Sequence, residues 1–438
     1  MTGLKETHSN GDEIMVVGYK DTPIGKIPED WDVVKLGDKR IAEIRGNKSV
    51  SGVDKIAFIP MELIPDSGIC TGYEIRKINE VKSSTYCEAG DLLLAKITPS
   101  LENGKQGIVP DDIPNGFALA TTEVFPIVCK GIDRLFLFYI LKHPKFRKIL
   151  EYSMRGTTGR QRVPKEAVEN LLIPFPPLSE QKKIAEILST VDKAIEKVDE
   201  AIAKTERLKK GLMQELLTKG IGHKEFKYSK ELGCEIPKEW RVLTLKEIAK
   251  EFISGGTPST KEPRYWNGDI PWIRSVHLVK YYIDDSLIEQ YITKEGLENS
   301  AAKIIPKNNV IIATRVGIGK AAVNLIDVAI NQDLTGVILN KSLIDPFFLG
   351  WYLISPKVVK KLESFSRGTT IKGIPQKVLK NLPIPLPPLE EQQKIAEILS
   401  TVDKKLELER KSKEKLERIK KGLMNDLLTG KRRVKVGV

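Results

Sequence analysis

The residues that could perform enzyme chemistry lack the spacing which that chemistry requires. The stretch VGIGKAA (316–322) resembles a phosphate-binding loop, but Thr314 stands where such a loop has its first glycine, and no serine or threonine follows Lys320. The stretches FPPL (175–178) and LPPL (386–389) lack the polar first residue and the aromatic last residue of the strip with which adenine methyltransferases hold a flipped base. We therefore interpret VGIGKAA as a turn between strands and predict no catalytic residues.

Residue types that bind metal ions are dispersed along the chain. The four histidines form no HExxH motif and the four cysteines form no CxxC pair. The Pro-Asp pair at 65–66 is followed by EIRK rather than by the Glu-x-Lys of a common nuclease core. We expect no metal ion, no cofactor, and reduced thiols in a cytoplasmic protein.

The charge balance favours a polyanionic partner. The 438 residues include 71 Lys and Arg against 58 Asp and Glu, a formal net charge of +13 that is spread along the chain. This favours nucleic acid, and a merely lysine-rich surface is the alternative. No apolar window is long enough to span a membrane, and the polar start MTGLKETHSNGDE differs from a signal peptide, so we expect a soluble protein.

The elements that would position a binding surface occur twice. LSEQKKIAEILSTVDKAIE (178–196) and LEEQQKIAEILSTVDKKLE (389–407) agree at 14 of their first 16 positions, 211 residues apart. Other matched pairs are IPEDWDVVKLGD (27–38) with IPKEWRVLTLKE (236–247), RGTT (155–158) with RGTT (367–370), and KKGLMQELLT (209–218) with KKGLMNDLLT (420–429). Repeats of this length are whole domains. The sequences of 39–154 and 248–366 agree poorly. The matched stretches are therefore duplicated, while the globular sequences between them have diverged.

Each globular stretch has a mixed pattern. Short apolar runs bounded by turn residues predict strands at 55–60, 91–97, 309–316 and 334–340. The stretches 135–153 and 347–365 have a helical pattern, with a proline at the same place in both. The predicted fold class is therefore α+β, with two mixed α/β globular domains.

A long amphipathic helix follows the proline-rich stretch of each copy. Proline ends the preceding element, and the apolar residues after it alternate spacings of three and four, as in a coiled coil. Each helix has about 40 residues and is roughly 60 Å long at ~1.5 Å per residue. The predicted interface positions are Ile184, Leu188, Val191, Ile195, Val198, Ile202, Ile395, Leu399, Val402, Leu406, Leu416, Ile419 and Leu423.

An apolar stripe of this length can be covered by the globular domain of its own copy or by the second helix. We favour two antiparallel helices packed on each other, because the first helix carries the chain away from the first domain and the second returns it. This predicts two globular domains at opposite ends of a rod, with internal pseudo-two-fold symmetry. The predicted segments are an N-terminal tail (1–22), a first domain (23–177), a helix (178–219), a linker (220–235), a second domain (236–388), a helix (389–430) and a basic C-terminal tail (431–438).

The duplicated basic chain resembles the specificity subunit of type I restriction-modification systems over essentially its whole length. The most specific marks are GTTIKGIPQKVLKNLPIPLPPLEEQQKIAEILSTVDKKLE (368–407) and SGGTPSTKEPRYWNGDIPWIRSVHL (254–278), which looks like the opening of a target-recognition domain of that family. The first domain departs from the pattern, because EIRGNKSVSGVDKIAFIPMELI (43–64) has neither GGTPS nor the Pro-Trp pair.

The resemblance implies a non-catalytic subunit in which each target-recognition domain reads one half of a bipartite, asymmetric site in double-stranded DNA. It implies that the helix pair is a spacer and that the chain assembles with two methyltransferase subunits, which use S-adenosylmethionine to methylate adenine. Restriction subunits, which hydrolyse ATP, are a further partner that the resemblance allows. A coiled-coil scaffold joining two proteins, and an enzyme with an unrecognised site, are the alternatives.

DNA contact requires Arg and Lys for phosphates and guanine, Asn and Gln for adenine, and hydroxyl or backbone N–H groups for phosphates. The candidates are Arg45, Asn47, Lys48, Lys96, Lys105 and Gln106 in the first domain, and Ser259, Lys261, Arg264, Tyr265, Arg274, Ser275, Arg315 and Lys320 in the second. A solvated surface charge is the alternative for each of them. We interpret Trp266 and Trp272 as core residues rather than as base-stacking residues.

The RGTT motif is retained near the end of both domains and has a basic continuation in both. Its candidate residues are Arg155, Thr157, Thr158 and Arg160 in the first copy, and Arg367, Thr369, Thr370 and Lys372 in the second. Phosphate contact through the arginine, the hydroxyls and the glycine N–H is one interpretation. A turn that only shapes the chain is the other.

Overall fold

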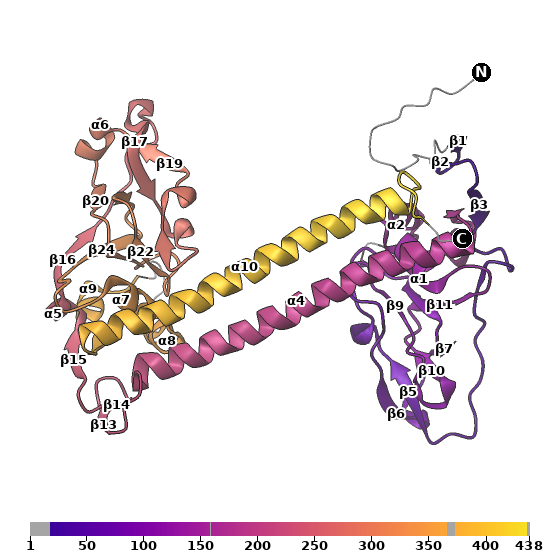
Figure 1. Ribbon diagram of the computed structural model, residues 1–438, viewed down its shortest axis with the longest axis horizontal. Helices are drawn as coiled ribbons and strands as arrows, with labels where there is room; N and C mark the ends of the chain where they lie inside the picture. The colour runs from indigo at the N-terminus through magenta and orange to yellow at the C-terminus, as the bar shows by residue number, and fades with distance from the viewer. Residues whose placement is uncertain (1–17, 158, 366–372, 436–438) are drawn as a thin grey trace. The chain divides into compact units, whose positions relative to one another are not determined.

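The computed structural model describes residues 18–157, 159–365 and 373–435 (Figure 1). Contacts divide the chain into two units, which are Met1–Glu200 with Arg410–Val438 (unit 1) and Ala201–Glu409 (unit 2). Each unit therefore combines a globular portion with parts of both long helices. Within the described ranges, no helix is long and apolar enough to cross a membrane.

The globular portion of unit 1 is built mainly from strands. They form two four-stranded sheets, in the orders β6-β5-β10-β7 and β4-β11-β8-β9, and the pairs β1-β2 and β3-β12. All these neighbours are antiparallel except β5 and β10, which are parallel. The strands are β1 (Tyr19–Thr22), β2 (Gly25–Pro28), β3 (Asp32–Lys35), β4 (Ala42–Ile44), β5 (Lys55–Ile59), β6 (Glu74–Lys77), β7 (Thr85–Glu88), β8 (Leu92–Ala95), β9 (Gln106–Ile108), β10 (Phe117–Ala120), β11 (Val124–Cys129) and β12 (Leu172–Phe175).

Unit 2 has a similar mixture of elements. Its sheets have the orders β16-β24-β21-β22-β18 and β19-β17-β23-β20, with the pairs β13-β14 and β15-β25. The parallel neighbours are β17 with β23 and β18 with β22. The strands are β13 (Phe226–Ser229), β14 (Cys234–Pro237), β15 (Arg241–Thr244), β16 (Ala249–Ser254), β17 (Trp266–Ile273), β18 (Tyr282–Ile283), β19 (Gln290–Ile292), β20 (Lys303–Ile305), β21 (Val310–Ala313), β22 (Ala321–Asn324), β23 (Val328–Ile330), β24 (Leu334–Leu339) and β25 (Pro383–Leu386).

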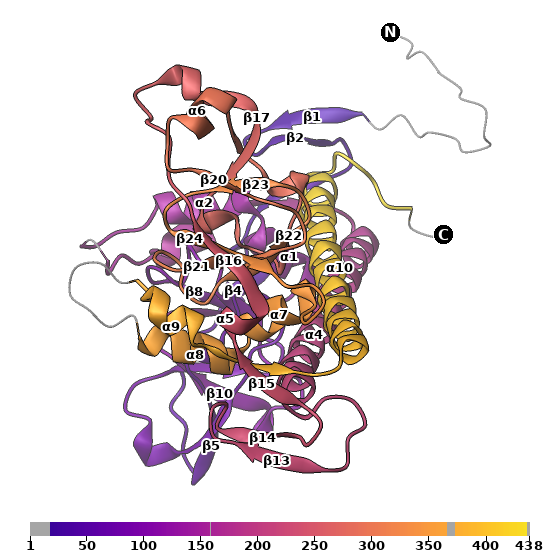
Figure 2. The ribbon, with the colours of Figure 1, turned by 90° about the vertical axis from the view of Figure 1, so that its left-hand side faces the viewer.

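Short helices accompany the sheets, and one long helix follows the last strand of each globular portion, α4 after β12 and α10 after β25. Figure 2 shows unit 2 from the side on which α8 and α9 lie close together and the β13–β14 hairpin lies at the periphery. The helices are α1 (Arg134–Lys142), α2 (Pro144–Tyr152), α3 (Lys165–Glu169), α4 (Leu178–Lys219), α5 (Leu245–Ile248), α6 (Lys294–Glu298), α7 (Pro346–Leu353), α8 (Pro356–Ser364), α9 (Gln376–Lys380) and α10 (Leu389–Leu427).

The structure confirms the four predicted strands as β5, β8, β21 and β24. Each predicted helical stretch is divided into two helices at its proline. Helix α2 begins at Pro144 and α8 at Pro356, because proline lacks the N–H that a continuous helix needs but is favourable in a first turn.

Buried hydrogen bonds hold the first turn of α4 on the globular portion of unit 1. The Glu180 carboxylate is buried, and it accepts a hydrogen bond from Trp31 Nε1 at 3.0 Å. Arg433, which lies beyond the end of α10, donates to both Glu180 oxygens at 2.7 and 2.8 Å and also to Asp30. The hydrogen bond from Arg433 lowers the pKa of Asp30. One carboxylate thus joins the start of α4, the entry tryptophan and the segment after α10.

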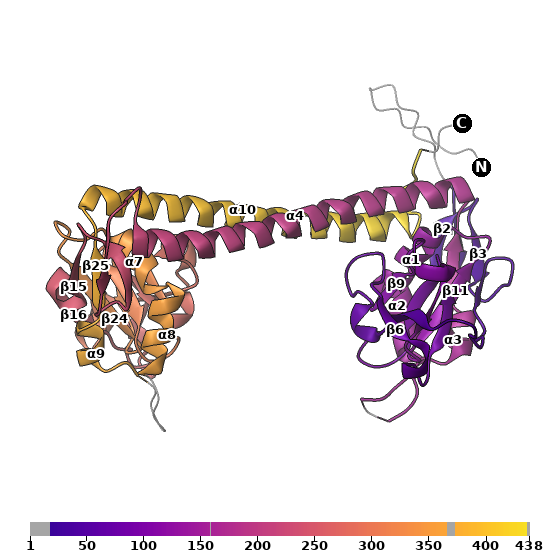
Figure 3. The same ribbon diagram turned by 90° about the horizontal axis from the view of Figure 1, so that it is seen from below.

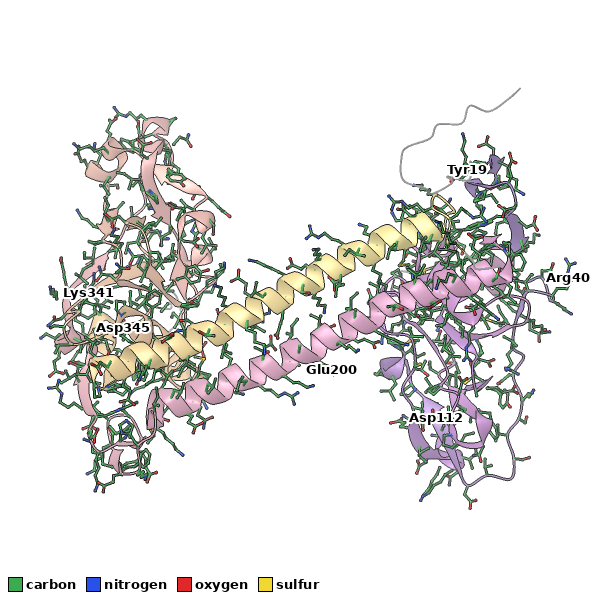
Figure 4. All side chains as sticks on the ribbon, viewed as in Figure 1. Tyr19, Arg40, Asp112, Glu200, Lys341 and Asp345 are labelled. Atoms are coloured by element: carbon green, nitrogen blue, oxygen red, sulfur yellow. The ribbon has the colours of Figure 1, made fainter. Side chains whose placement is uncertain are left out.

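The first turn of α10 is held in the same way in unit 2. Trp240 Nε1 donates to Glu391 Oε2 at 3.0 Å, and His223 Nε2 lies 2.8 Å from Glu391 Oε1. The next residue, Gln392, accepts a hydrogen bond from the backbone N–H of Asp345 at 2.8 Å, near the start of α10 in Figure 4. A histidine after α4 therefore takes the place that an arginine after α10 takes in unit 1.

Two glycines follow the ends of the long helices. Gly220 has φ +67° and Gly430 has φ +71°, a conformation that favours glycine. A Cβ at Gly220 would lie 2.6 Å from the Trp240 ring, and one at Gly430 would overlap Pro28. Both glycines therefore allow a close approach that a side chain would prevent.

Parts of α4 and α10 lie side by side within each unit and run in opposite directions (Figure 1). Polar residues that interrupt the apolar pattern make contacts between the helices. The interhelical polar pairs are Asp192–Lys420 (2.5 Å) and Asp199–Lys413 (2.6 Å) in unit 1, and Thr205–Glu409 (3.2 Å) and Lys209–Asp403 in unit 2.

The predicted interface positions differ in their burial. Fully or almost fully buried are Ile184, Leu188, Ile395, Leu399 and Leu406, of which the first four belong to the cores of the globular portions. Half-buried are Val191, Ile195, Val198, Ile202, Val402, Leu416 and Leu423. Ile419 is 43% exposed, which corrects the prediction for this residue. Its neighbours Lys420 and Met424 turn inward instead, because Lys420 pairs with Asp192 and Met424 joins the unit 1 core.

We expect Arg433→Met to lower the free energy of unfolding by about 1–3 kcal/mol, because it leaves the buried Glu180 carboxylate without its charged partner. Urea unfolding followed by tryptophan fluorescence measures the change. The control is Arg432→Met, since the Arg432 guanidinium is largely exposed and pairs with Asp426 at 3.4 Å. We expect a change within about 0.5 kcal/mol for that variant. Equal losses in the two variants would contradict the role of Arg433.

Candidate nucleic-acid interface

Three loops meet at one end of the sheets in unit 1. Loop 1a (60–64) follows β5, loop 1b (96–105) connects β8 to β9, and loop 1c (the described residues 153–157 and 159–163) carries the first RGTT copy. Loops at the ends of a rigid sheet are the usual place for binding residues, because the sheet fixes their position while their sequence can vary.

Hydrogen bonds join the three loops of unit 1. Lys105 Nζ donates to the carbonyl oxygens of Met61 and Ile64 at 2.9 and 3.0 Å, which connects loop 1b to loop 1a. The backbone N–H of Thr98 donates to the Gln161 carbonyl at 3.0 Å, which connects loop 1b to loop 1c. Lys105 therefore has a structural role in addition to its charge.

Loop 1c is a hairpin that projects from unit 1 on the side away from α4 (Figure 3). Arg155 and Arg162 exchange two backbone hydrogen bonds of 2.9 Å at its base, and Arg160 N donates to the Thr157 carbonyl. The Arg162 guanidinium binds both oxygens of Glu123 at 2.8 Å, and this hydrogen bonding lowers the pKa of Glu123. Arg155, Thr157 and Arg160 are exposed, so this copy of the motif both forms a turn and presents basic side chains.

Three further candidates of unit 1 are engaged in internal contacts. Arg45 binds Asp91 through two hydrogen bonds of 2.6 and 2.8 Å and is largely buried. Asn47 accepts from a backbone N–H, and Lys48 pairs with Glu88 at 2.9 Å while remaining exposed. Arg45 is therefore a structural residue in this conformation, and Lys48 is the more accessible of the two cations.

The DNA-contact prediction for Gln106 is wrong for this conformation. Its side chain is fully buried, donates to the Phe138 carbonyl at 2.6 Å and accepts from Arg147 at 2.9 Å. Because side chains alternate along a strand, Gln106 at the start of β9 points into the core, where it supplies an acceptor for a buried arginine. Lys96 is half-buried with its Nζ 5.0 Å from the Phe125 ring centre, and burial lowers its pKa.

Unit 2 has a corresponding loop arrangement. Loop 2a (274–278) follows β17, loop 2b (314–320) connects β21 to β22, and loop 2c (373–375) precedes α9. The backbone N–H of Ile374 donates to the Thr314 carbonyl at 2.8 Å, which connects loops 2b and 2c. Loop 2b lies beside loop 2a, since a Cβ built at Gly317 would be in ordinary contact with Ser275 Cβ, at 3.7 Å.

The candidates on loops 2a and 2b are mostly accessible. Arg274, Arg315 and Lys320 are exposed, and the three lie on loops that contact one another. Ser275 is buried, which corrects the prediction that its hydroxyl contacts DNA.

The remaining candidates of unit 2 lie at the other end of β17. Arg264 pairs with Glu295 at 3.0 Å, and Trp266 Nε1 donates to the Ser259 carbonyl at 3.1 Å. Ser259, Lys261 and Arg264 are exposed, whereas Tyr265 is buried and is corrected as a DNA contact. Trp272 is confirmed as a core residue, and Trp266, half-buried, meets its ring edge-on at 5.2 Å.

Sequence reasoning missed several residues of the loop arrangement. Val276 and Val316 are exposed on loops 2a and 2b, but a valine in a sequence does not reveal which side it faces. Arg162 and Glu123 were missed because their pairing joins residues far apart in the chain. The candidates Thr158, Arg367, Thr369, Thr370 and Lys372 lie outside the described residues.

The described residues offer little for bond-making chemistry. No group of three His, Cys, Asp or Glu residues among them could hold a metal ion. Burial raises the pKa of the Cys87 and Cys129 thiols to about 12, so neither is a reactive thiolate at neutral pH. What the two loop arrangements present is exposed basic side chains on rigid mixed sheets, which is suited to binding a polyanion.

These features are those expected of a nucleic-acid recognition protein. A family model described as the type I restriction modification DNA specificity domain matches twice, at residues 28–204 and 237–418. The chain belongs to this family. The predicted family is confirmed, and with it the prediction of a DNA-specificity subunit that has no catalytic function of its own.

Individual relatives span the whole chain. It is 33% identical to a putative type I restriction enzyme MjaX specificity subunit of Methanocaldococcus jannaschii, over 95% of this chain and 97% of the relative. It is 34% identical to the MjaVIII specificity subunit of the same organism, over 94% and 95%. The solved type I restriction-modification S subunit from M. genitalium has a similar fold, with TM-score 0.56 at 16% identity over 91% of this chain and 96% of that one.

Replacing Arg155 or Arg160 with alanine should weaken DNA binding to a similar degree for all sequences, because these side chains suit phosphate contact. For each arginine that contacts a phosphate, the slope of log K against log salt should fall by about 0.9. Fluorescence anisotropy of the assembled complex at several salt concentrations measures both. Arg40→Ala is the control, since Arg40, labelled in Figure 4, is exposed and pairs with Asp38. It precedes β4 at the end of its sheet opposite to loop 1b, because β11 pairs with Ala42 at its last residue and with Ala95 at its first. An unchanged slope in both loop variants would rule out this phosphate contact.

Proposed function

We propose that this chain is the cytoplasmic DNA-specificity subunit of a type I restriction-modification system and that each unit reads one half of a bipartite, asymmetric site. The observation that carries this proposal is the pair of loop arrangements, 1a–1c and 2a–2c. They follow corresponding strands, yet their sequences differ. Two globular portions with similar strands but different loops can present different side chains in the same arrangement. This suits a protein that binds two different DNA sequences. The family of the chain supports DNA as the ligand.

The two long helices act in this proposal as an antiparallel coiled coil that fixes the gap between the half-sites. The interhelical pairs in unit 1 and in unit 2 support it, because in both units residue numbers rise along one helix as they fall along the other. The matched contacts of Glu180 and Glu391 support an internal pseudo-two-fold axis. Polar residues inside the apolar pattern, such as Glu409 and Lys413, would specify the register.

Two methyltransferase subunits would dock on the helices, with ATP-dependent restriction subunits as further partners. Leu208 in unit 2 and Ile419 in unit 1 occupy the same repeat position, and they are 51% and 43% exposed. Gly211 and Gly422, three residues further along each helix, have open space beside them. An exposed apolar residue beside a glycine suits a second helix, which can approach closely there. Its occurrence in both units suits two identical partners on one chain.

The test is to map adenine methylation in DNA exposed to the complex reconstituted from this chain and its methyltransferase subunit. We expect methylation at a bipartite site with two different half-sites, and none when this chain is omitted. Methylation of a continuous palindrome, or at the same sites without this chain, would refute the proposal.

Lengthening both long helices by one helical turn, in α4 between Glu200 and Ala201 and in α10 between Glu409 and Arg410, should widen the preferred gap by about one to two base pairs, because a turn spans ~5.4 Å and one base-pair step ~3.4 Å. The half-sites should stay the same, since loops 1a–1c and 2a–2c are untouched. Methylation mapping measures both quantities. The control is an equal insertion between Lys230 and Glu231, in the β13–β14 turn, which should leave the gap unchanged. Altered half-site bases in the first variant would contradict a spacer role.

Leu406→Glu should lower the free energy of unfolding by roughly 2–5 kcal/mol, and with it the unfolding temperature. The reason is that the substitution buries an unpaired charge at a residue that is 4% exposed. Val191→Glu, at a half-buried position, should have a smaller effect of the same sign. Leu408→Glu is the matched control on the same helix, because Leu408 is 58% exposed. Calorimetry compares the three variants, and unchanged unfolding of Leu406→Glu would count against the helix interface.

A further inference from the structure

One turn occupies the same place in both units and carries an exposed side chain. β5 in unit 1 and β17 in unit 2 each run parallel to a neighbouring strand, and each is followed by a 3₁₀ turn, Met61–Leu63 or Ser275–His277. Counted from the last strand residue, Ile59 or Ile273, the third position is Glu62 in unit 1 and Val276 in unit 2. The two units therefore present different chemistry from one structural position.

Both turns are held rigidly by buried neighbours. Ile64 and Leu278, which follow the turns, are buried in the cores below. In unit 2, His277 Nδ1 accepts a hydrogen bond from Arg274 N at 2.9 Å. In unit 1, Lys105 binds two carbonyl oxygens of loop 1a. A side chain on such a turn keeps its position, which reading a base edge requires.

The turn of unit 2 is apolar at its surface. Val276 is 54% exposed, and Val316 on the contacting loop 2b is 59% exposed. The neighbouring Arg315 is exposed and makes no ion pair within the described ranges. Exposed valines among basic residues do not contribute to binding phosphates, but apolar side chains do contact the 5-methyl group of thymine in the major groove.

The turn of unit 1 presents an acid in a basic protein. Glu62 is exposed, and its carboxylate makes no ion pair or hydrogen bond with the part of the chain that the structure describes. A carboxylate near DNA is repelled by phosphates, so it is favourable there only when it accepts a hydrogen bond from a base. The exocyclic amino group of cytosine is the donor that Glu and Asp accept in the major groove.

We infer that Glu62 and Val276 are specificity-determining residues: Glu62 accepts from a cytosine amino group in the half-site of unit 1, and Val276 with Val316 contacts a thymine methyl group in the half-site of unit 2. This inference rests on the proposed function and adds the chemical identity of one base in each half-site.

For unit 2, the probe is a duplex in which each thymine of that half-site is replaced in turn by deoxyuridine, which lacks only the methyl group. One replacement should weaken binding of the assembled complex about fivefold to tenfold. The double variant Val276→Ala, Val316→Ala should bind thymine and deoxyuridine duplexes equally. Leu325→Ala, an exposed leucine at the far end of β22, should retain the full discrimination. Equal binding of both duplexes by the unchanged protein, or a half-site without thymine, would overturn the inference.

For unit 1, Glu62→Val should relax the preference for one cytosine in the other half-site by about tenfold and leave the half-site of unit 2 unchanged. Glu80→Val, at another exposed glutamate of unit 1, should change neither half-site. Altered preference at both half-sites, or at none, would overturn the assignment of Glu62.

Different results would contradict the assignment of Glu62 and Val276 and the proposed function. If the complex binds a bipartite site but ignores the methyl group and tolerates Glu62→Val without change, this inference is wrong and the proposed function stands. If the complex shows no sequence preference at all, the proposed function itself is wrong.

Discussion

The architecture of each unit depends on a carboxylate at the first turn of a long helix, which is buried in unit 1 and largely buried in unit 2. Glu180 in unit 1 and Glu391 in unit 2 each accept a hydrogen bond from an entry tryptophan and contact a basic side chain, Arg433 or His223, from the segment after the other helix. A buried carboxylate without such partners is costly, so each contact requires the others. One residue therefore fixes the start of one helix, the end of the other and the first strands of the globular portion together.

This constraint explains which parts of the chain match between the two copies. The tryptophan, the proline-rich stretch, the helix start and the glycine after the helix all surround the carboxylate, and a change in any of them would disturb the rest. The loops at the ends of the sheets take no part in it. Loop 1b and loop 2b are consequently free to differ in sequence and length, while backbone hydrogen bonds to the segments that follow the RGTT motif keep them in place.

Some basic side chains of unit 1 stabilise the fold, and others are available for binding. Arg45, Arg147 and Arg162 are used inside unit 1, where they pair with acids or carbonyl oxygens. Arg155 and Arg160 remain exposed on the hairpin. A net charge of +13 thus does not say which cations are available, because burial and local pairing decide it.

The sequence by itself determined the duplication, the long helices, several strands and the family, because these depend on local pattern: prolines stop an element, apolar spacing defines a helix, and matched stretches define a repeat. Only the tertiary structure decided which candidates could meet DNA. Gln106, Ser275 and Tyr265 have the right chemistry but are buried, and Ile419 fits the apolar spacing but is 43% exposed. The physical reason is that side-chain direction and partner choice depend on residues distant in the chain, such as Arg147 for Gln106 and Asp192 for Lys420. The sequence around Glu62 and Val276 does not show that these residues are exposed. Exposure depends on how the whole domain packs.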